Sequence, residues 1–188
     1  MPRLFALVVS VLLLLTACMH APRKPVIALP PLQLAPAALG QTLALQQRLQ
    51  FHFGNQARTM DALLEVDPDE VRLVVQALGQ AGVRLQWDGK SLQQQRAAWL
   101  PPAVRAERVL DDLQFTLWPV DAIRAVLPAG WSVRDDGKTR ELLHDAKVWL
   151  SLTRVDANHW RLDNRAEGYQ LEIASTAAET AGEAGTSP

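Results

Sequence analysis

Hydrophobic and polar residues alternate along residues 43–53, where leucine and phenylalanine occupy every second position except at Gln47. A period of two residues is typical of a strand with one face in a hydrophobic core. Turn-forming Asp-Pro and Asp-Gly pairs at 67–68, 88–89 and 136–137 separate further segments of this kind. We therefore predict antiparallel strands at about residues 43–53, 57–66, 71–78, 83–87, 91–99, 131–134, 139–143, 147–154, 159–164 and 169–173.

The hydrophobic period changes to 3.6 residues after Pro101 and Pro102, which predicts a helix. A second, short helix is expected at about residues 119–127, ended by Pro128 and Gly130. The apolar stripe of the first helix consists of Ala106, Val109, Leu110, Leu113 and Leu117. Its charged residues are expected outside that stripe, and these are Arg105, Glu107, Arg108, Asp111 and Asp112.

The predicted elements follow an unusual order: several antiparallel strands, a helical insertion, and then several more strands. A single sheet of about eight strands has to curl. A helix with one apolar face is stabilised by covering the open face of such a sheet. The predicted fold class is α+β, a curved antiparallel half-barrel sheet capped by a short helical insertion.

The N-terminus has the pattern of an export signal. Arg3 precedes the apolar run 4–15, which is interrupted only by Ser10 and is short for a membrane-spanning helix. The four residues that end at Cys18, Leu-Thr-Ala-Cys, resemble the lipobox of bacterial lipoproteins. That resemblance implies cleavage after residue 17, acylation of Cys18 as a membrane anchor, and, because Met19 follows, transfer to the outer membrane. The alternative is an ordinary signal peptide with a cysteine nearby by chance.

The mature chain divides into three parts by composition. Residues 18–40 contain five prolines and are predicted to be an acylated, Pro-rich tether, although Leu29, Leu32 and Leu34 leave packing on the domain as an alternative. Residues 41–174 form the predicted folded domain, and 175–188 have the small and polar composition of a disordered tail.

Charge and cysteine content argue against a nucleic-acid partner and against an internal disulfide. The whole chain has 19 basic and 20 acidic side chains, a formal net charge of −1, so nothing suggests a nucleic-acid partner. Cys18 is the only cysteine, which excludes an internal disulfide.

Several short segments resemble a family of uncharacterised bacterial lipoproteins whose genes lie beside those for aryl-polyene surface pigments. These segments are Leu110-Asp111-Asp112-Leu113, Trp118-Pro119, the run 127–131, Arg140, and the run 168–173. The resemblance covers about residues 41–174 and implies a fold similar to that of the lipoprotein-localisation factors LolA and LolB, a half-open barrel with a helical lid. Leu78, ahead of Gly79, takes the place of the leucine at the tip of the protruding LolB loop, although Ala77 replaces the proline that flanks it there.

Large aromatic residues are the main candidates for a binding site. In a half-barrel with a lid they line a cavity, and in a closed domain they fill the core. The candidate cavity residues are Trp87, Trp99, Trp118, Trp149, Trp160, Leu113 and Tyr169. Arg140 is expected either to pair with a carboxylate inside the barrel or to bind an anionic head group at its mouth.

No pattern of catalytic or metal-binding residues is present. The four histidines lack metal-type spacing, and no nucleophile motif occurs. Asp111 and Asp112 are consecutive helix positions that face different ways, so they do not predict paired acid–base chemistry. We therefore expect no enzyme activity, cofactor or metal.

The sequence thus predicts a lipoprotein on the periplasmic side of the outer membrane. It would bind or transfer an apolar lipid-like ligand, for example an aryl-polyene lipid or a lipoprotein acyl chain. The alternative is a scaffold that binds no ligand and tethers envelope export or biosynthesis proteins.

Overall fold

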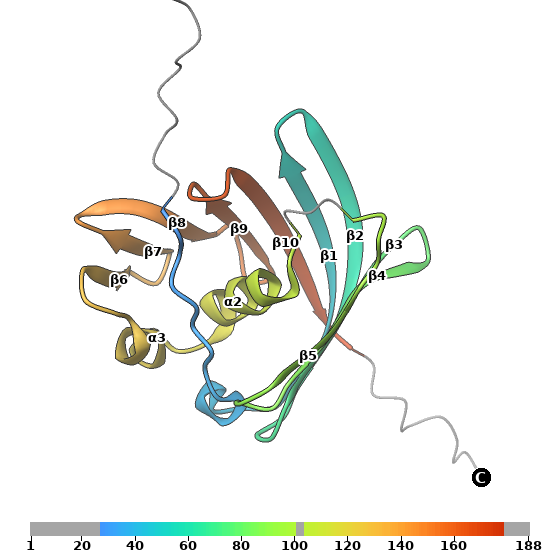
Figure 1. The fold of residues 1–188 in the computed structure, drawn as a ribbon, viewed down its shortest axis with the longest axis horizontal. Coiled ribbons are helices and arrows are strands. Elements are labelled where there is room, and N and C mark those ends of the chain that lie inside the picture. The colour runs from blue at the N-terminus through green and yellow to red at the C-terminus, as the bar shows by residue number, and fades with distance from the viewer. Residues whose placement is uncertain (1–26, 101–103, 179–188) are drawn as a thin grey trace, which may run out of the picture.

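The computed structural model describes residues 27–100 and 104–178. Its main feature is one open antiparallel sheet of ten strands in the order β5-β4-β3-β2-β1-β10-β9-β8-β7-β6. Two runs of hairpins, β1 to β5 and β6 to β10, are joined where β1 pairs with β10. Figure 1 shows the sheet curving around the helix α2. The α+β class and the curved antiparallel sheet with two short helices are confirmed.

The ten strands match the ten predicted segments, with ends that shift by a few residues. Their bounds are β1 Leu43–Phe53, β2 Gln56–Val66, β3 Val71–Ala77, β4 Gln80–Trp87, β5 Leu92–Arg96, β6 Trp131–Asp135, β7 Thr139–His144, β8 Lys147–Arg154, β9 His159–Asn164 and β10 Tyr169–Ala177. The predicted turn chemistry is present, since Asp88 accepts hydrogen bonds from the Lys90 and Ser91 N–H groups at 2.8 and 2.7 Å. Asp136 accepts equivalent bonds in the turn between β6 and β7.

The helical insertion contains α2, Ala106–Leu117, and α3, Val120–Val126. The apolar stripe of α2 is confirmed, because Ala106, Leu110 and Leu113 are buried. Of the charged residues predicted outside that stripe, Arg108, Asp111 and Asp112 are nevertheless buried, which the sequence did not predict. The reason is that α2 is covered on two sides, by the sheet and by an N-terminal segment of the chain.

Residues 27–40, which we term the N-terminal strap, are part of the folded unit. Leu29, Leu32, Leu34 and Leu39 are only 4–5 % exposed, and the strap ends in the short 3-10 helix η1, Pro36–Leu39. The strap runs past α2 in Figure 1. The prediction of a spacer is therefore wrong from Leu29 onward, because these leucines bury enough apolar surface to hold the segment on the domain.

The C-terminal boundary also moves. Strand β10 continues to Ala177, beyond the predicted domain end at residue 174. The strand extends because β10 stays paired with β1 as far as Leu45 opposite Ala177. Ser175 is buried, and its hydroxyl oxygen accepts a 2.9 Å hydrogen bond from the Gln47 amide. The predicted signal peptide, Cys18 and residues 179–188 lie outside the described residues. Within the part of the chain that is described, none of the helices has the length and hydrophobicity needed to cross a bilayer.

Candidate ligand cavity and its polar wall

A small apolar cavity of about 90 Å³ lies between α2 and the concave face of the sheet. Strands β1 to β4 and β10 contribute most of its lining, and the rest comes from α2 and from the segment between β5 and α2, which includes Trp99 and Leu100. The principal apolar lining residues are Leu49, Met60, Leu73, Val75, Leu113 and Ile173.

The strand register explains why these side chains meet. Leu49 of β1 is directly opposite Met60 of β2 and Ile173 of β10. Side chains opposite one another in an antiparallel pair point to the same face. The alternating pattern of β1 therefore places an apolar row, interrupted only by Gln47, on the inside of the curve, facing α2.

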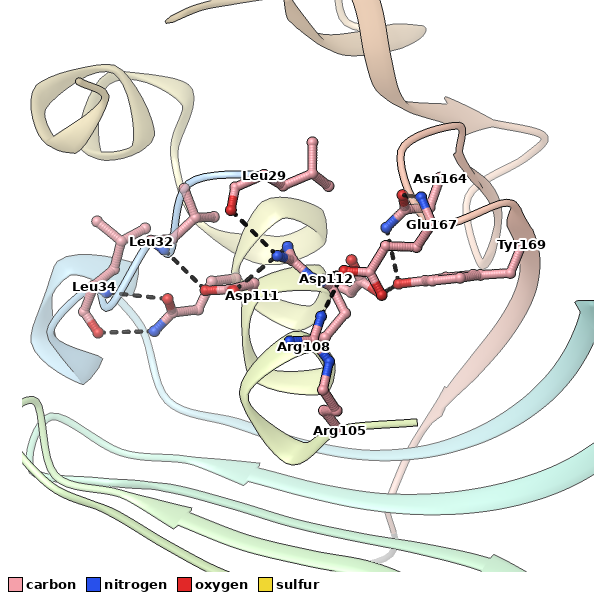
Figure 2. A network of polar contacts seen from close by, with 11 residues as sticks. Leu29, Leu32, Leu34, Arg105, Arg108, Asp111, Asp112, Asn164, Glu167 and Tyr169 are labelled. Atoms are coloured by element: carbon pink, nitrogen blue, oxygen red, sulfur yellow. Dashed lines mark hydrogen bonds and ion pairs between the residues drawn. The ribbon is translucent and has the colours of Figure 1, made fainter. Parts of the chain in front are cut away.

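One wall of the cavity is polar and comes from α2 and the end of β10. Arg108, Asp112 and Tyr169 all border the cavity. Figure 2 shows these side chains converging with Glu167, which lies in the turn between β9 and β10. The buried polar groups are connected by hydrogen bonds and ion pairs into a network, as buried polar groups usually are.

Arg108 is the cation of this network. Its Nε is 3.0 Å from a Glu167 carboxylate oxygen, and its Nη1 is 3.4 Å from Asp111. Burial acts to lower the pKa of Arg108, but the neighbouring carboxylates outweigh that effect and raise the pKa above its usual value. Arg108 therefore stays charged and fully engaged with protein carboxylates.

Asp112 and Tyr169 form the second part of the network. The Tyr169 hydroxyl donates a hydrogen bond to Asp112 Oδ2. Asn164 Nδ2 in turn donates to the Tyr169 oxygen at 3.0 Å. The other Asp112 oxygen, Oδ1, is buried and has no hydrogen-bond partner, and it is the sole such side-chain atom within the described residues.

Burial has the largest effect on the pKa values of Asp111 and Asp112. It raises the pKa of Asp112 to about 7, although the Tyr169 hydrogen bond and the Arg108 charge act in the opposite direction. Burial likewise raises the pKa of Asp111 to about 6, against the Leu32 N–H and Arg108. The pKa of the Tyr169 hydroxyl is raised by burial and by the adjacent Asp112 carboxylate, so it remains a donor.

The strap is held by the opposite side of α2. Asp111 Oδ1 accepts a 2.8 Å hydrogen bond from the Leu32 N–H. The Gln114 amide bonds both the N–H and the carbonyl of Leu34, at 3.0 and 2.8 Å. These contacts satisfy strap backbone groups that would otherwise be buried without partners.

The predicted cavity residues divide into three groups. Trp99, Leu113 and Tyr169 line the cavity, and Trp99 is 40 % exposed. Trp87 and Trp118 lie outside its lining in the core, where their indole N–H groups donate to the strap carbonyls of Leu34 and Ala35.

The last two candidate tryptophans, Trp149 and Trp160, are not part of the cavity lining. The Lys147 ammonium group lies 4.0 Å from the ring centroid of Trp149, a cation–π contact. Trp160 borders a separate surface groove with Arg48, His159 and Arg161.

Leu78 and Arg140 lie at two distinct places. Leu78 is fully exposed at the tip of the β3–β4 hairpin and has a positive φ of 52°. Arg140 donates to the carbonyls of Phe115 and Trp118 and pairs with Asp135 at 2.7 Å. Arg140 thus joins the end of α2 to β6 and β7. The sequence left two roles open for Arg140, pairing with a carboxylate or binding an anionic head group, and the structure shows the pairing, with Asp135.

The sequence did not identify the polar wall. Arg108, Asp111 and Asp112 occupy positions i, i+3 and i+4, which lie next to one another on a helix. That spacing was the available signal, but a charged helix face is usually solvated. Asn164 and Glu167 had no distinguishing pattern. Among the described residues, no group of three or more His, Cys, Asp or Glu is arranged to hold a metal ion.

The fold and the cavity define a class of protein, an α+β domain whose open sheet curls around one helix and encloses a small apolar space. The chain belongs to a family described as proteins of unknown function (DUF3261), whose model matches residues 44–177. Membership of an uncharacterised family is therefore confirmed, and the match spans the sheet from β1 to β10. No match was found among the curated proteins.

Proposed function

We propose that this protein is an outer-membrane lipoprotein, anchored on the periplasmic side through acylated Cys18, that binds or transfers an apolar lipid-like ligand inside its half-barrel. The observation that carries the proposal is the apolar cavity between α2 and the concave sheet. Burial of an acyl or polyene chain there stabilises the complex by ~25 cal/mol per Å² of apolar surface removed from water. Binding of this kind needs no catalytic group. The resemblance to LolA and LolB, and to lipoproteins of aryl-polyene loci, supports the same reading.

The size of the cavity implies a moving part. A space of about 90 Å³ is smaller than the roughly 300–1,000 Å³ of ligand pockets. A chain therefore enters only if the cavity expands. We propose that α2 is the lid, because it covers the cavity and meets the sheet near its β4–β5 edge.

A cross-link between α2 and the sheet tests the lid. Glu107 on α2 accepts a hydrogen bond from Gln94 on β5, so the pair Gln94→Cys and Glu107→Cys, in a Cys18→Ser background, is suited to a short bismaleimide linker. Nile red, a neutral apolar dye that fluoresces when buried, reports occupancy. We expect the linked protein to take up dye at least tenfold more slowly than the unlinked protein, because the lid can no longer open.

The matched control places the same linker on the β6–β7 pair Arg134→Cys and Glu141→Cys, which lies outside the cavity lining. This control should take up dye at the normal rate. Equal uptake by the α2-linked protein and the control would contradict a lid formed by α2.

The anchor is tested separately by Cys18→Ser. This variant should neither incorporate radiolabelled palmitate nor fractionate with the outer membrane, because the thiol that carries the acyl chains is missing. Retention of both properties would contradict the lipobox interpretation.

The second candidate is a scaffold that binds no ligand and tethers envelope export or biosynthesis proteins. The small cavity favours this candidate, since side chains already fill most of the barrel. Native mass spectrometry of the purified protein distinguishes the two functions. A co-purified lipid supports the carrier, whereas an empty protein that also fails to bind Nile red supports the scaffold.

A further inference from the structure

The unpartnered oxygen of Asp112 gives the cavity a chemical preference. Asp112 is only 8 % exposed, borders the cavity, and has a buried Oδ1 without a hydrogen-bond partner. An unsatisfied buried polar atom is unfavourable and is uncommon in native proteins, where a bound molecule often explains it. A water molecule needs two to four polar partners, and the lining of this cavity is mostly apolar.

The hydrogen-bond directions around Asp112 follow from the backbone. The Glu167 N–H donates to Asn164 Oδ1 at 2.9 Å, so the amide nitrogen of Asn164 faces Tyr169. The Tyr169 oxygen accepts that bond and directs its own hydrogen to Asp112 Oδ2. Oδ2 is therefore an acceptor in either protonation state, and Oδ1 is the atom left to bind a ligand.

The charges around Asp112 disfavour an anion. Arg108 is engaged by Glu167, Asp111 and the Leu29 carbonyl, and Arg105 also pairs with Glu167. The carboxyl groups of Glu167 and Asp111 thus already pair with both guanidinium groups. A carboxylate or phosphate head group at this wall would find Arg105 and Arg108 already paired with protein carboxylates and would lie close to the Asp112 carboxyl group.

We propose that the cavity selects a single-chain amphiphile ending in a neutral hydroxyl, whose O–H donates to Asp112 Oδ1, and discriminates against the corresponding carboxylate. This inference rests on the proposed ligand-binding function and defines the head group of its ligand. The apolar lining receives the chain, and the polar wall receives the hydroxyl.

The proposal predicts how affinity depends on pH. The titratable and charged groups that act on Asp112 are Arg108 and Asp111 on α2, Glu167 in the β9–β10 turn, and Tyr169 on β10. A hydroxyl can donate to an ionised Oδ1 and accept from a protonated one, so its affinity changes little with pH. A carboxylate can only accept, so it binds only while Asp112 is protonated. Its affinity falls as the pH rises through the Asp112 pKa of about 7.

Displacement of Nile red by three ligands with the same chain tests the head group. The ligands are dodecanol, dodecyl methyl ether and dodecanoate, and the protein is the full chain with Cys18→Ser, so that no attached acyl chain competes. At about pH 8, where Asp112 is mostly ionised, we expect dodecanol to bind about tenfold more tightly than either other ligand. The ether lacks the donor hydrogen, and dodecanoate carries the wrong charge.

The variant Asp112→Asn should abolish the preference, as protonation of Asp112 does. Its side-chain oxygen can still accept the Tyr169 hydrogen bond, which leaves the amide N–H to donate equally well to the oxygen of dodecanol, of the ether or of dodecanoate. The control Asp61→Asn changes a carboxylate that is exposed on β2 and should preserve the preference for dodecanol. Melting curves check that both variants are folded, and if Asp112→Asn does not fold, the ranking and pH profile of the parent protein decide.

The outcomes separate the two proposals. Equal displacement of bound Nile red by dodecanol and its ether, or unchanged ranking in folded Asp112→Asn, would overturn the head-group inference and leave ligand binding intact. Failure of the protein to bind Nile red or any of the three ligands would overturn the proposed function and this inference with it.

Discussion

The two sides of α2 carry neighbouring aspartates with different surroundings. On the strap side, Asp111 is bonded to the Leu32 N–H and to Arg108. On the cavity side, Asp112 bonds Tyr169 through one oxygen and leaves the other without a partner. Both carboxyl groups are buried on the same helix. Asp111 has a protein partner for each of its two oxygens, whereas Asp112 has a partner for one oxygen alone.

This contrast separates residues that stabilise the fold from those available to a ligand. The strap side holds a segment some 80 residues earlier in the chain, as the Gln114–Leu34 hydrogen bonds show. The cavity side encloses apolar space next to an unsatisfied polar atom. Substitutions on the strap side should therefore affect stability most, and those on the cavity side should affect binding most.

The largest effect is expected for Trp118→Ala. Trp118 is fully buried at the end of α2, and its indole N–H donates to the strap carbonyl of Ala35 at 3.1 Å. Removal of the ring leaves a cavity and breaks this link, so the free energy of unfolding should fall by about 3–5 kcal/mol. Urea denaturation measures the loss.

The control for this measurement is Trp99→Ala, which removes a half-exposed ring from the cavity wall instead. Trp99→Ala should lower the free energy of unfolding by less than half as much as Trp118→Ala. Similar losses for the two variants would show that the cavity wall is as important to the fold as the strap.

The second largest effect is expected for Asp111→Ala. The change leaves the Leu32 N–H buried without a partner and removes one carboxylate from Arg108. Glu167 still pairs with that arginine, so the expected loss is about 2–3 kcal/mol rather than that of an isolated buried charge. Amide hydrogen exchange at Leu32 should increase in the same variant, and an unchanged exchange rate would contradict docking of the strap through Asp111.

The sequence predicted the sheet and helices well, because those elements depend on local patterns. Alternation in β1 and the aspartates of the turns identify strands without reference to distant residues. The strap could not be predicted in this way. Its prolines suit a spacer as well as an extended segment in the core, and its partners, Gln114 and Trp87 among them, are far along the chain.

The polar wall was missed for a related reason. A helix with charged residues beside its apolar stripe is ordinarily solvated on that side. Asp111 and Asp112 are buried because the strap covers one side of α2 and the end of β10 covers the other. Five of the six tryptophans were predicted to line the cavity, yet Trp99 alone of these five lines it. A tryptophan in a strand is equally suited to a core and to a cavity, so its identity does not decide between them.

The smallest loss of stability is expected for Asp112→Asn, and its sign should depend on pH. The folded-state pKa of Asp112 is about 7, above the value of 3.8 for an unperturbed aspartate. Between these values the folded state binds a proton that the unfolded state has released. The contribution of Asp112 to stability is therefore greatest below about pH 4 and declines as the pH rises to about 7.

Asparagine has nearly the same shape as aspartic acid and cannot ionise, so the variant avoids this decline. Below about pH 4 the two proteins should differ by less than ~1 kcal/mol, because protonated aspartic acid and asparagine are both neutral and both can bond Tyr169. As the pH rises toward 7 the variant should become the more stable protein, since the parent protein then buries an ionised oxygen without a partner. Thermal melts of both proteins at several pH values measure the difference. A variant that loses stability relative to the parent protein as the pH rises would show that a cation binds the Asp112 carboxylate, and that the two sides of α2 are equally satisfied by the protein.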